Sequence, residues 1–220
     1  MNNTKQFFLI FCLVIPLLVA PRSQAGAGGG IQAATNDAPT ARTVIEHLND
    51  TLISCMKQGE ELGFQGRYNL LLPVMKEAFW YSLMVRKTTG SYWRKMTPEE
   101  RKTLLDKYIA WSVSSYAERF TRYKGQQFVI SSCTPFREKY RRVVVDILKN
   151  GKKKRSLEYL LAFDHDRNSW RIVDIRVKGI SQLSLTRAQF KAVLKLTGVD
   201  GLLALLDEKI EALTPKFDTK

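Results

Sequence analysis

Four consecutive segments in the middle of the chain alternate apolar and polar residues, and this pattern constrains the fold more than any other feature. A period of two is typical of strands. The segments are Gln127 to Ser132, Tyr140 to Lys149, Arg155 to Asp164 and Trp170 to Lys178. Asn150-Gly151 is a strong signal for a tight hairpin turn, and residues 164–168 form a second polar turn. The sequence therefore predicts a curved antiparallel sheet of about four strands.

Helical periodicity precedes the predicted sheet. Apolar residues recur at helical spacing from Val44 to Cys55, and a second apolar face runs from Arg67 to Lys87. Pro73 inside the second segment predicts a kink or a first turn. Residues 97–100 combine an N-cap hydroxyl, an early proline and a glutamate, which predicts the start of a long aromatic helix that ends at Gly125.

Helical periodicity also follows the sheet. The pattern from Thr186 to Thr197 stops at Gly198, and Asp200 is placed to cap a final leucine-rich helix. Helices on both sides of a run of strands predict an α+β fold, in which the N-terminal and C-terminal helices pack on the sheet.

The N-terminus has the pattern of a secretory signal. Lys5 precedes an apolar run over residues 7–20, which is shorter than the about 20 residues that a membrane-spanning helix needs. Ser23 and Ala25 are the small residues that a signal peptidase reads. We therefore predict a cleaved signal peptide over residues 1–25, a flexible leader over residues 26–39 and a single domain over residues 40–216, exported from the cytoplasm.

The formal net charge of +14 favours anionic partners. An exported protein meets little nucleic acid, so phospholipid headgroups or acidic protein surfaces are the expected partners, and no nucleic acid is expected. Two basic clusters are candidates for a headgroup or docking site. The first is Arg137, Arg141 and Arg142, and the second, at the hairpin tip, is Lys152, Lys153 and Lys154. Arginine presents a fork that matches phosphate oxygens.

Residues that could perform chemistry are scarce. His47 is interpreted as a surface or boundary residue, and Asp164-His165-Asp166 falls in a tight turn where its side chains diverge. Metal binding requires three or four convergent ligands, so no metal or cofactor is predicted. Asp146 and Asp174 are either paired carboxylates or ordinary surface and edge residues. The protein is therefore not predicted to be an enzyme.

Two features leave alternatives open. The aromatic residues between Phe79 and Phe128 form either a bulky core or the walls of an apolar cavity. Cys55 and Cys133 either form a disulfide in an oxidising compartment or are two buried thiols.

Several local motifs follow one another in a fixed order along the chain. They are Tyr92-Trp93-Arg94, Thr97-Pro98-Glu99-Glu100-Arg101, Tyr123-Lys124-Gly125, Trp170-Arg171-Ile172-Val173-Asp174-Ile175, Gly179-Ile180-Ser181, Arg187 to Phe190, and Gly198-Val199-Asp200-Gly201-Leu202. These motifs and the order of elements resemble the MlaC family, also called the toluene-tolerance family of periplasmic lipid-binding proteins. The hopanoid-associated HpnM-like branch is suggested by residues 116–120 and 157–160.

The resemblance implies a monomeric lipid carrier, the substrate-binding component of an ABC-type system. It would shuttle phospholipid or hopanoid lipids between an outer-membrane lipoprotein complex and an inner-membrane ABC/MCE-type transporter. Acyl chains would lie in an apolar cavity between sheet and helices, with the headgroup at its mouth. Face assignments give the expected walls as Phe79, Leu83, Tyr108, Trp111, Val145, Tyr159, Leu161 and Ile175.

A different class of protein is the alternative, namely a non-transporting envelope assembly or interaction protein with a solid core. In that protein, Trp111→Ala would cost about 3–5 kcal/mol of stability without a separate loss of lipid binding. An enzyme on a similar fold would need convergent ionisable groups, which the sequence does not supply.

Overall fold

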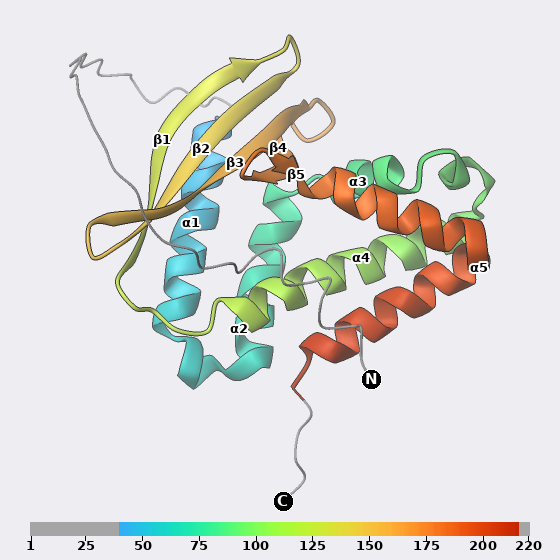
Figure 1. Ribbon diagram of the computed structural model, residues 1–220, viewed down its shortest axis with the longest axis horizontal. Helices are drawn as coiled ribbons and strands as arrows, with labels where there is room; N and C mark the ends of the chain where they lie inside the picture. The colour runs from blue at the N-terminus through green and yellow to red at the C-terminus, as the bar shows by residue number, and fades with distance from the viewer. Residues whose placement is uncertain (1–39, 216–220) are drawn as a thin grey trace, which may run out of the picture. The chain divides into compact units, whose positions relative to one another are not determined.

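The structure is a computed structural model and describes residues 40–215 (Figure 1). The chain divides into residues 1–37 and residues 38–220, and all described residues belong to the second unit. The predicted signal peptide and the whole of the predicted leader therefore lie outside the described residues. A search of residues 40–215 finds no helix whose length and hydropathy would let it cross a membrane.

An antiparallel sheet of five strands forms one layer, in the order β1-β2-β3-β4-β5. The four predicted strands are confirmed, and the two-residue β5 was not predicted. The register shifts within the β1–β2, β2–β3 and β3–β4 pairs, and such bulges bend strands and increase their twist. Figure 1 shows the resulting curvature. The strands are β1 (Gln126–Phe136), β2 (Tyr140–Lys149), β3 (Lys152–Asp164), β4 (Ser169–Val177) and β5 (Ile180–Ser181).

The predicted hairpin turn at Asn150-Gly151 is confirmed. Both residues have positive φ, 53° at Asn150 and 70° at Gly151. A two-residue turn of this type needs positive φ at both positions because its twist then matches that of the strands, and Asn-Gly is the pair that tolerates this best. The turn pairs Lys149 with Lys152 and so sets the register of β2 against β3.

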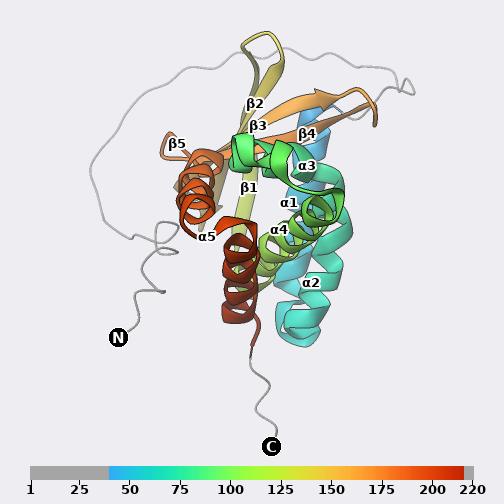
Figure 2. The same ribbon diagram turned by 90° about the vertical axis from the view of Figure 1, so that its right-hand side faces the viewer.

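Helices form the second layer, and Figure 2 shows them gathered on one side of the sheet. They are α1 (Ala41–Lys57), α2 (Gly59–Ala78), α3 (Tyr81–Thr89), the 3₁₀ helix η3 (Gly90–Lys95), α4 (Pro98–Arg119) and α5 (Gln182–Leu213). The first residue of α2 is Gly59, and only glycine fits at this position. A β-carbon there would lie 2.0 Å from the carbonyl oxygen of Thr121.

The predicted continuous helix from Arg67 to Lys87 is wrong. The chain leaves the helical conformation at Phe79, whose backbone is extended and bridges to Ile172 in β4. The amide of Trp80 donates to the carbonyl oxygen of Ile172 at 2.9 Å. This bond to the sheet edge separates α2 from α3. Pro73 lies within α2, where the residue with non-helical backbone angles is Gly63.

The start of α4 is confirmed and its predicted end is wrong. Thr97 Oγ1 accepts from the amide of Glu100 at 3.1 Å, and Glu100 Oε2 accepts from the amide of Thr97 at 2.7 Å, which is a complete capping box. The helix ends at Arg119 rather than at Gly125, because Phe120 already has non-helical backbone angles.

The C-terminal helix starts earlier than predicted. It begins at Gln182 instead of Thr186, because Ser181 Oγ accepts from the amide of Ser184 and caps it. Gly198 has a φ of 68°, so the predicted interruption at this residue is confirmed.

Candidate functional site

The predicted wall residues on the sheet share one face. Tyr159 of β3 pairs with Val143 of β2 on one side and with Ile175 of β4 on the other, and paired residues point to the same face. Val145 and Leu161 lie on this face too, since alternate residues of a strand point the same way. Val145, Tyr159 and Leu161 are buried, and Ile175 is partly buried.

The predicted wall residues outside the sheet lie on α4, on α3 and between α2 and α3. Phe79 and Tyr108 are buried, whereas Leu83 and Trp111 keep part of their surface exposed. Tyr108 and Trp111 are in edge contact, with ring centroids 5.5 Å apart. The structure therefore places the wall residues in the interior or at its boundary.

A continuous series of aromatic rings links the helices to the first strand. Consecutive ring centroids are between 5.4 and 6.4 Å apart, within the range of favourable aromatic pairs. From α5 to β1 the series is Phe190, Tyr108, Tyr81, Phe79, Tyr116, Phe120 and Phe128. The sequence indicated a high aromatic content here, and the structure shows that the rings contact one another.

Tyrosines contribute neutral polar groups to this interior. Burial raises the pKa of Tyr116 to about 12, and it raises the pKa values of Tyr81, Tyr108 and Tyr159 as well. The hydroxyl of Tyr81 lies 3.0 Å from Ser112 Oγ. The phenols are therefore neutral at physiological pH. Neutral phenols beside apolar side chains are suited to binding a largely apolar ligand.

The first basic cluster stacks on aromatic rings at one end of the sheet. The guanidinium of Arg141 lies 5.0 Å from the ring centroid of Trp170, and those of Arg137 and Arg142 lie 5.5 and 5.9 Å from that of Phe136. Within residues 40–215, the buried Nε of Arg142 has no hydrogen-bond partner.

The second basic cluster lies at the other end of the sheet. Lys152, Lys153 and Lys154 are exposed at the start of β3, and Lys153 Nζ lies 2.8 Å from Asp146 Oδ1. Arg141 pairs with Leu161 near one end of the β2–β3 ladder, whereas Lys152 pairs with Lys149 at the opposite end. The two basic clusters therefore cannot form one anion site.

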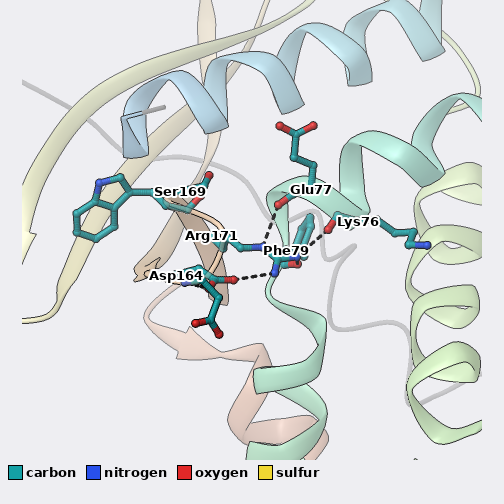
Figure 3. A network of polar contacts seen from close by, with 8 residues as sticks. Lys76, Glu77, Phe79, Asp164, Ser169 and Arg171 are labelled. Carbon is teal, nitrogen blue, oxygen red and sulfur yellow. Dashed lines mark hydrogen bonds and ion pairs between the residues drawn. The ribbon is translucent and has the colours of Figure 1, made fainter. Parts of the chain in front are cut away.

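Sequence reasoning missed the buried polar contacts that fix the helices to β4. Asp174 is buried, contrary to the surface or edge position considered for it, and its Oδ1 accepts from the amide of Leu183 at 3.0 Å. Asp164 is buried against Arg171, so it is not available as a metal ligand (Figure 3). A search of residues 40–215 finds no cluster of three or more metal-ligating side chains.

Cys55 and Cys133 are both free thiols. Cys55 is fully buried in α1, and burial raises its pKa to about 11. Cys133 is exposed on β1, so the alternative of two buried thiols is wrong for this residue.

Comparisons with known proteins find a solved structure of the same fold and a matching protein family. A solved structure of the phospholipid-binding protein from Ralstonia solanacearum in complex with a phospholipid matches with a TM-score of 0.65 and 22% sequence identity. The match covers 80% of this chain and 98% of that chain, and at this identity it establishes a common fold. The family model described as MlaC protein matches residues 46–208. Because this match covers most of the chain, the protein belongs to the MlaC family.

Proposed function

We propose that the protein is a periplasmic lipid carrier that takes up a phospholipid between its sheet and its helices. The proposal rests on the family match over residues 46–208, which include α2 to α4 and all five strands. The phospholipid bound by the Ralstonia protein of the same fold supports this ligand class. Residues 1–25 would then be the export signal, residues 26–39 a leader and residues 40–216 the carrier domain.

The arrangement of side chains supports a binding role. Burying one methylene group contributes about 0.8 kcal/mol, so acyl chains supply ample affinity without a charged contact. The wall residues on β2, β3 and β4 face the helices, and the aromatic series from Phe190 to Phe128 extends the apolar surface across α3 and α4. We propose that a lipid's acyl chains contact these side chains.

The headgroup site is proposed at the end of the sheet that carries Arg137, Arg141 and Arg142. Two of these guanidinium groups are already held against the ring of Phe136, which limits the conformational entropy lost when an anion binds. The unpartnered buried Nε of Arg142 supports the choice of this cluster over the exposed hairpin tip.

The family suggests the partners. We propose that the protein exchanges lipid with an outer-membrane lipoprotein complex and an inner-membrane ABC/MCE-type transporter, as the substrate-binding component of an ABC-type system. Hopanoid lipids are a second candidate cargo, supported by the HpnM-like motifs at residues 116–120 and 157–160.

Native mass spectrometry of protein purified from a periplasmic extract tests the proposal. The spectrum of wild-type protein is expected to show an added mass from a bound ligand. Collisional activation should release this ligand, and its mass should identify it as a lipid. Leu83→Trp at a partly buried wall position should reduce the lipid-bound fraction, and Val129→Trp at an exposed position of β1 should leave it unchanged.

The same experiment separates the carrier from a solid-core interaction protein. In a solid core, Leu83→Trp would only overpack the interior, at a cost of about 1–3 kcal/mol. Wild-type protein without bound lipid, or equal lipid occupancy in the two variants, would contradict the carrier.

A further inference from the structure

The first half of α5 presents a charged face that no other element covers. Residues 182–197 contain no aspartate or glutamate, and three cations recur at intervals of one helical turn, at Arg187, Lys191 and Lys195. All three are exposed. Among the described residues, none of the three makes an ion pair. The positive charge of this face is therefore not neutralised within the domain.

The neighbouring segment extends this basic surface. The helix α3 and the 3₁₀ helix η3, which together span residues 81–95, also lack acidic residues and carry the exposed cations Arg86, Arg94 and Lys95. Figures 1 and 2 both show α3 beside the first half of α5, and the two helices are in contact. The guanidinium of Arg187 lies 3.9 Å from where a β-carbon on Gly90 would be, at the start of η3.

Exposed apolar side chains are concentrated on the same helix. Of the five exposed large hydrophobic residues among residues 40–215, Leu185 and Leu196 lie on α5, and Ile180 lies in β5, two positions before the helix. Leu196 is 82% exposed, the most of the five. Leu185, Ala188, Ala192 and Leu196 follow helical spacing and form a stripe beside the three cations. The opposite side of the helix holds Phe190 and Leu194, which are buried.

We propose that this face of α5 docks the protein on an anionic lipid bilayer. A basic stripe beside exposed leucines is the pattern of a helix that lies in the membrane interface, with its cations at the headgroups and its apolar residues at the acyl boundary. An acidic protein surface would also attract the cations, but the exposed Leu185 and Leu196 beside them favour a bilayer, which offers an apolar region directly below its anionic headgroups. The docking face is separate from the aromatic interior, so the proposal holds whatever that interior carries.

Sedimentation with lipid vesicles tests the docking face, using protein purified from a periplasmic extract at physiological salt. The vesicles contain either phosphatidylglycerol with phosphatidylcholine or phosphatidylcholine alone. The test variant combines Arg187→Gln, Lys191→Gln and Lys195→Gln. The control combines Arg42→Gln, Lys57→Gln and Lys76→Gln, which removes the same charge from exposed positions of α1 and α2. Circular dichroism confirms that each variant is folded.

We expect wild-type protein to bind the anionic vesicles, and the α5 variant to bind them at least about tenfold more weakly, since each basic residue at such a surface contributes about 1 kcal/mol. The control should bind much as wild type does. Leu196→Ser should weaken binding relative to wild type, and this loss should be larger at high salt than at physiological salt, because salt screens the contribution of the cations.

Three results would overturn the proposal. The first is wild-type protein that does not bind anionic vesicles, which would leave this face as a site for an acidic protein. The second is an equal loss of binding in the α5 variant and the control, which would show attraction by net charge alone. The third is unchanged binding in both Leu196→Ser and the α5 variant.

Discussion

Arg171 donates a hydrogen bond from Nη1 to Asp164 Oδ2 at 3.0 Å, and the two side chains are only 7% and 4% exposed. The rest of the guanidinium donates to the backbone carbonyl oxygens of Lys76, Glu77 and Phe79 at 2.7, 3.1 and 2.5 Å (Figure 3). These carbonyls lie at the C-terminal end of α2, where a helix lacks internal donors. One buried cation on β4 thus joins the end of α2 to the end of β3.

Arg171→Met is expected to destabilise the protein by about 3–5 kcal/mol, because it leaves the Asp164 carboxylate buried without a counter-ion. Urea unfolding measures the change. Arg176→Met is a matched control, since Arg176 is partly exposed and lies 3.9 Å from Glu158 Oε2. Its loss should cost less than about 1 kcal/mol. Equal effects of the two substitutions would show that the buried pair does not hold α2 to the sheet.

Alkaline pH should destabilise the protein through its buried tyrosines. Burial raises the pKa of Tyr116 from 10.0 to about 12, so between these values the unfolded chain releases a proton that the folded protein retains. The stabilisation from Tyr116 is therefore complete below pH 10 and is lost as the pH rises through 12. Urea midpoints measured at rising pH should fall, and less steeply in Tyr116→Phe. Identical slopes in the variant and the wild type would contradict the burial of this phenol.

The two thiols should react at very different rates. Cys55 is fully buried and its pKa is raised to about 11, so almost none of it is thiolate at neutral pH. Cys133 is exposed. Brief alkylation at neutral pH followed by peptide mass spectrometry is expected to find label on Cys133 and none on Cys55, with both labelled in denaturant. Resistance of both thiols until a reductant is added would instead indicate a disulfide between them.

The sheet could be predicted from the sequence because its signals are local. Alternation defined the strands, and Asn150-Gly151 can form the tight turn that fixes the register of β2 against β3. The capping box at Thr97 was predictable for the same reason, since the residues that form it are only three positions apart.

What could not be predicted depends on contacts between distant residues. The residues around Phe79 favour a helix on either side, and the break between them comes from the bridge to Ile172. The partners of Arg171 at Glu77 and Lys76 are 94 and 95 positions away in the chain, so no local pattern identifies them. Face assignments did place Tyr159 and Leu161 on the buried side of the sheet, because burial alternates with a period of two from Leu157 to Leu161.

Lipid uptake and delivery by the purified protein test the central claim most directly. Delipidated protein is incubated with vesicles that contain a labelled phospholipid, separated from them, and then mixed with unlabelled acceptor vesicles. The proposed carrier should retain label after the donor vesicles are removed and should release it to the acceptors, while Leu83→Trp retains less. A protein fraction without label, in a sample that is folded by circular dichroism, would contradict the account.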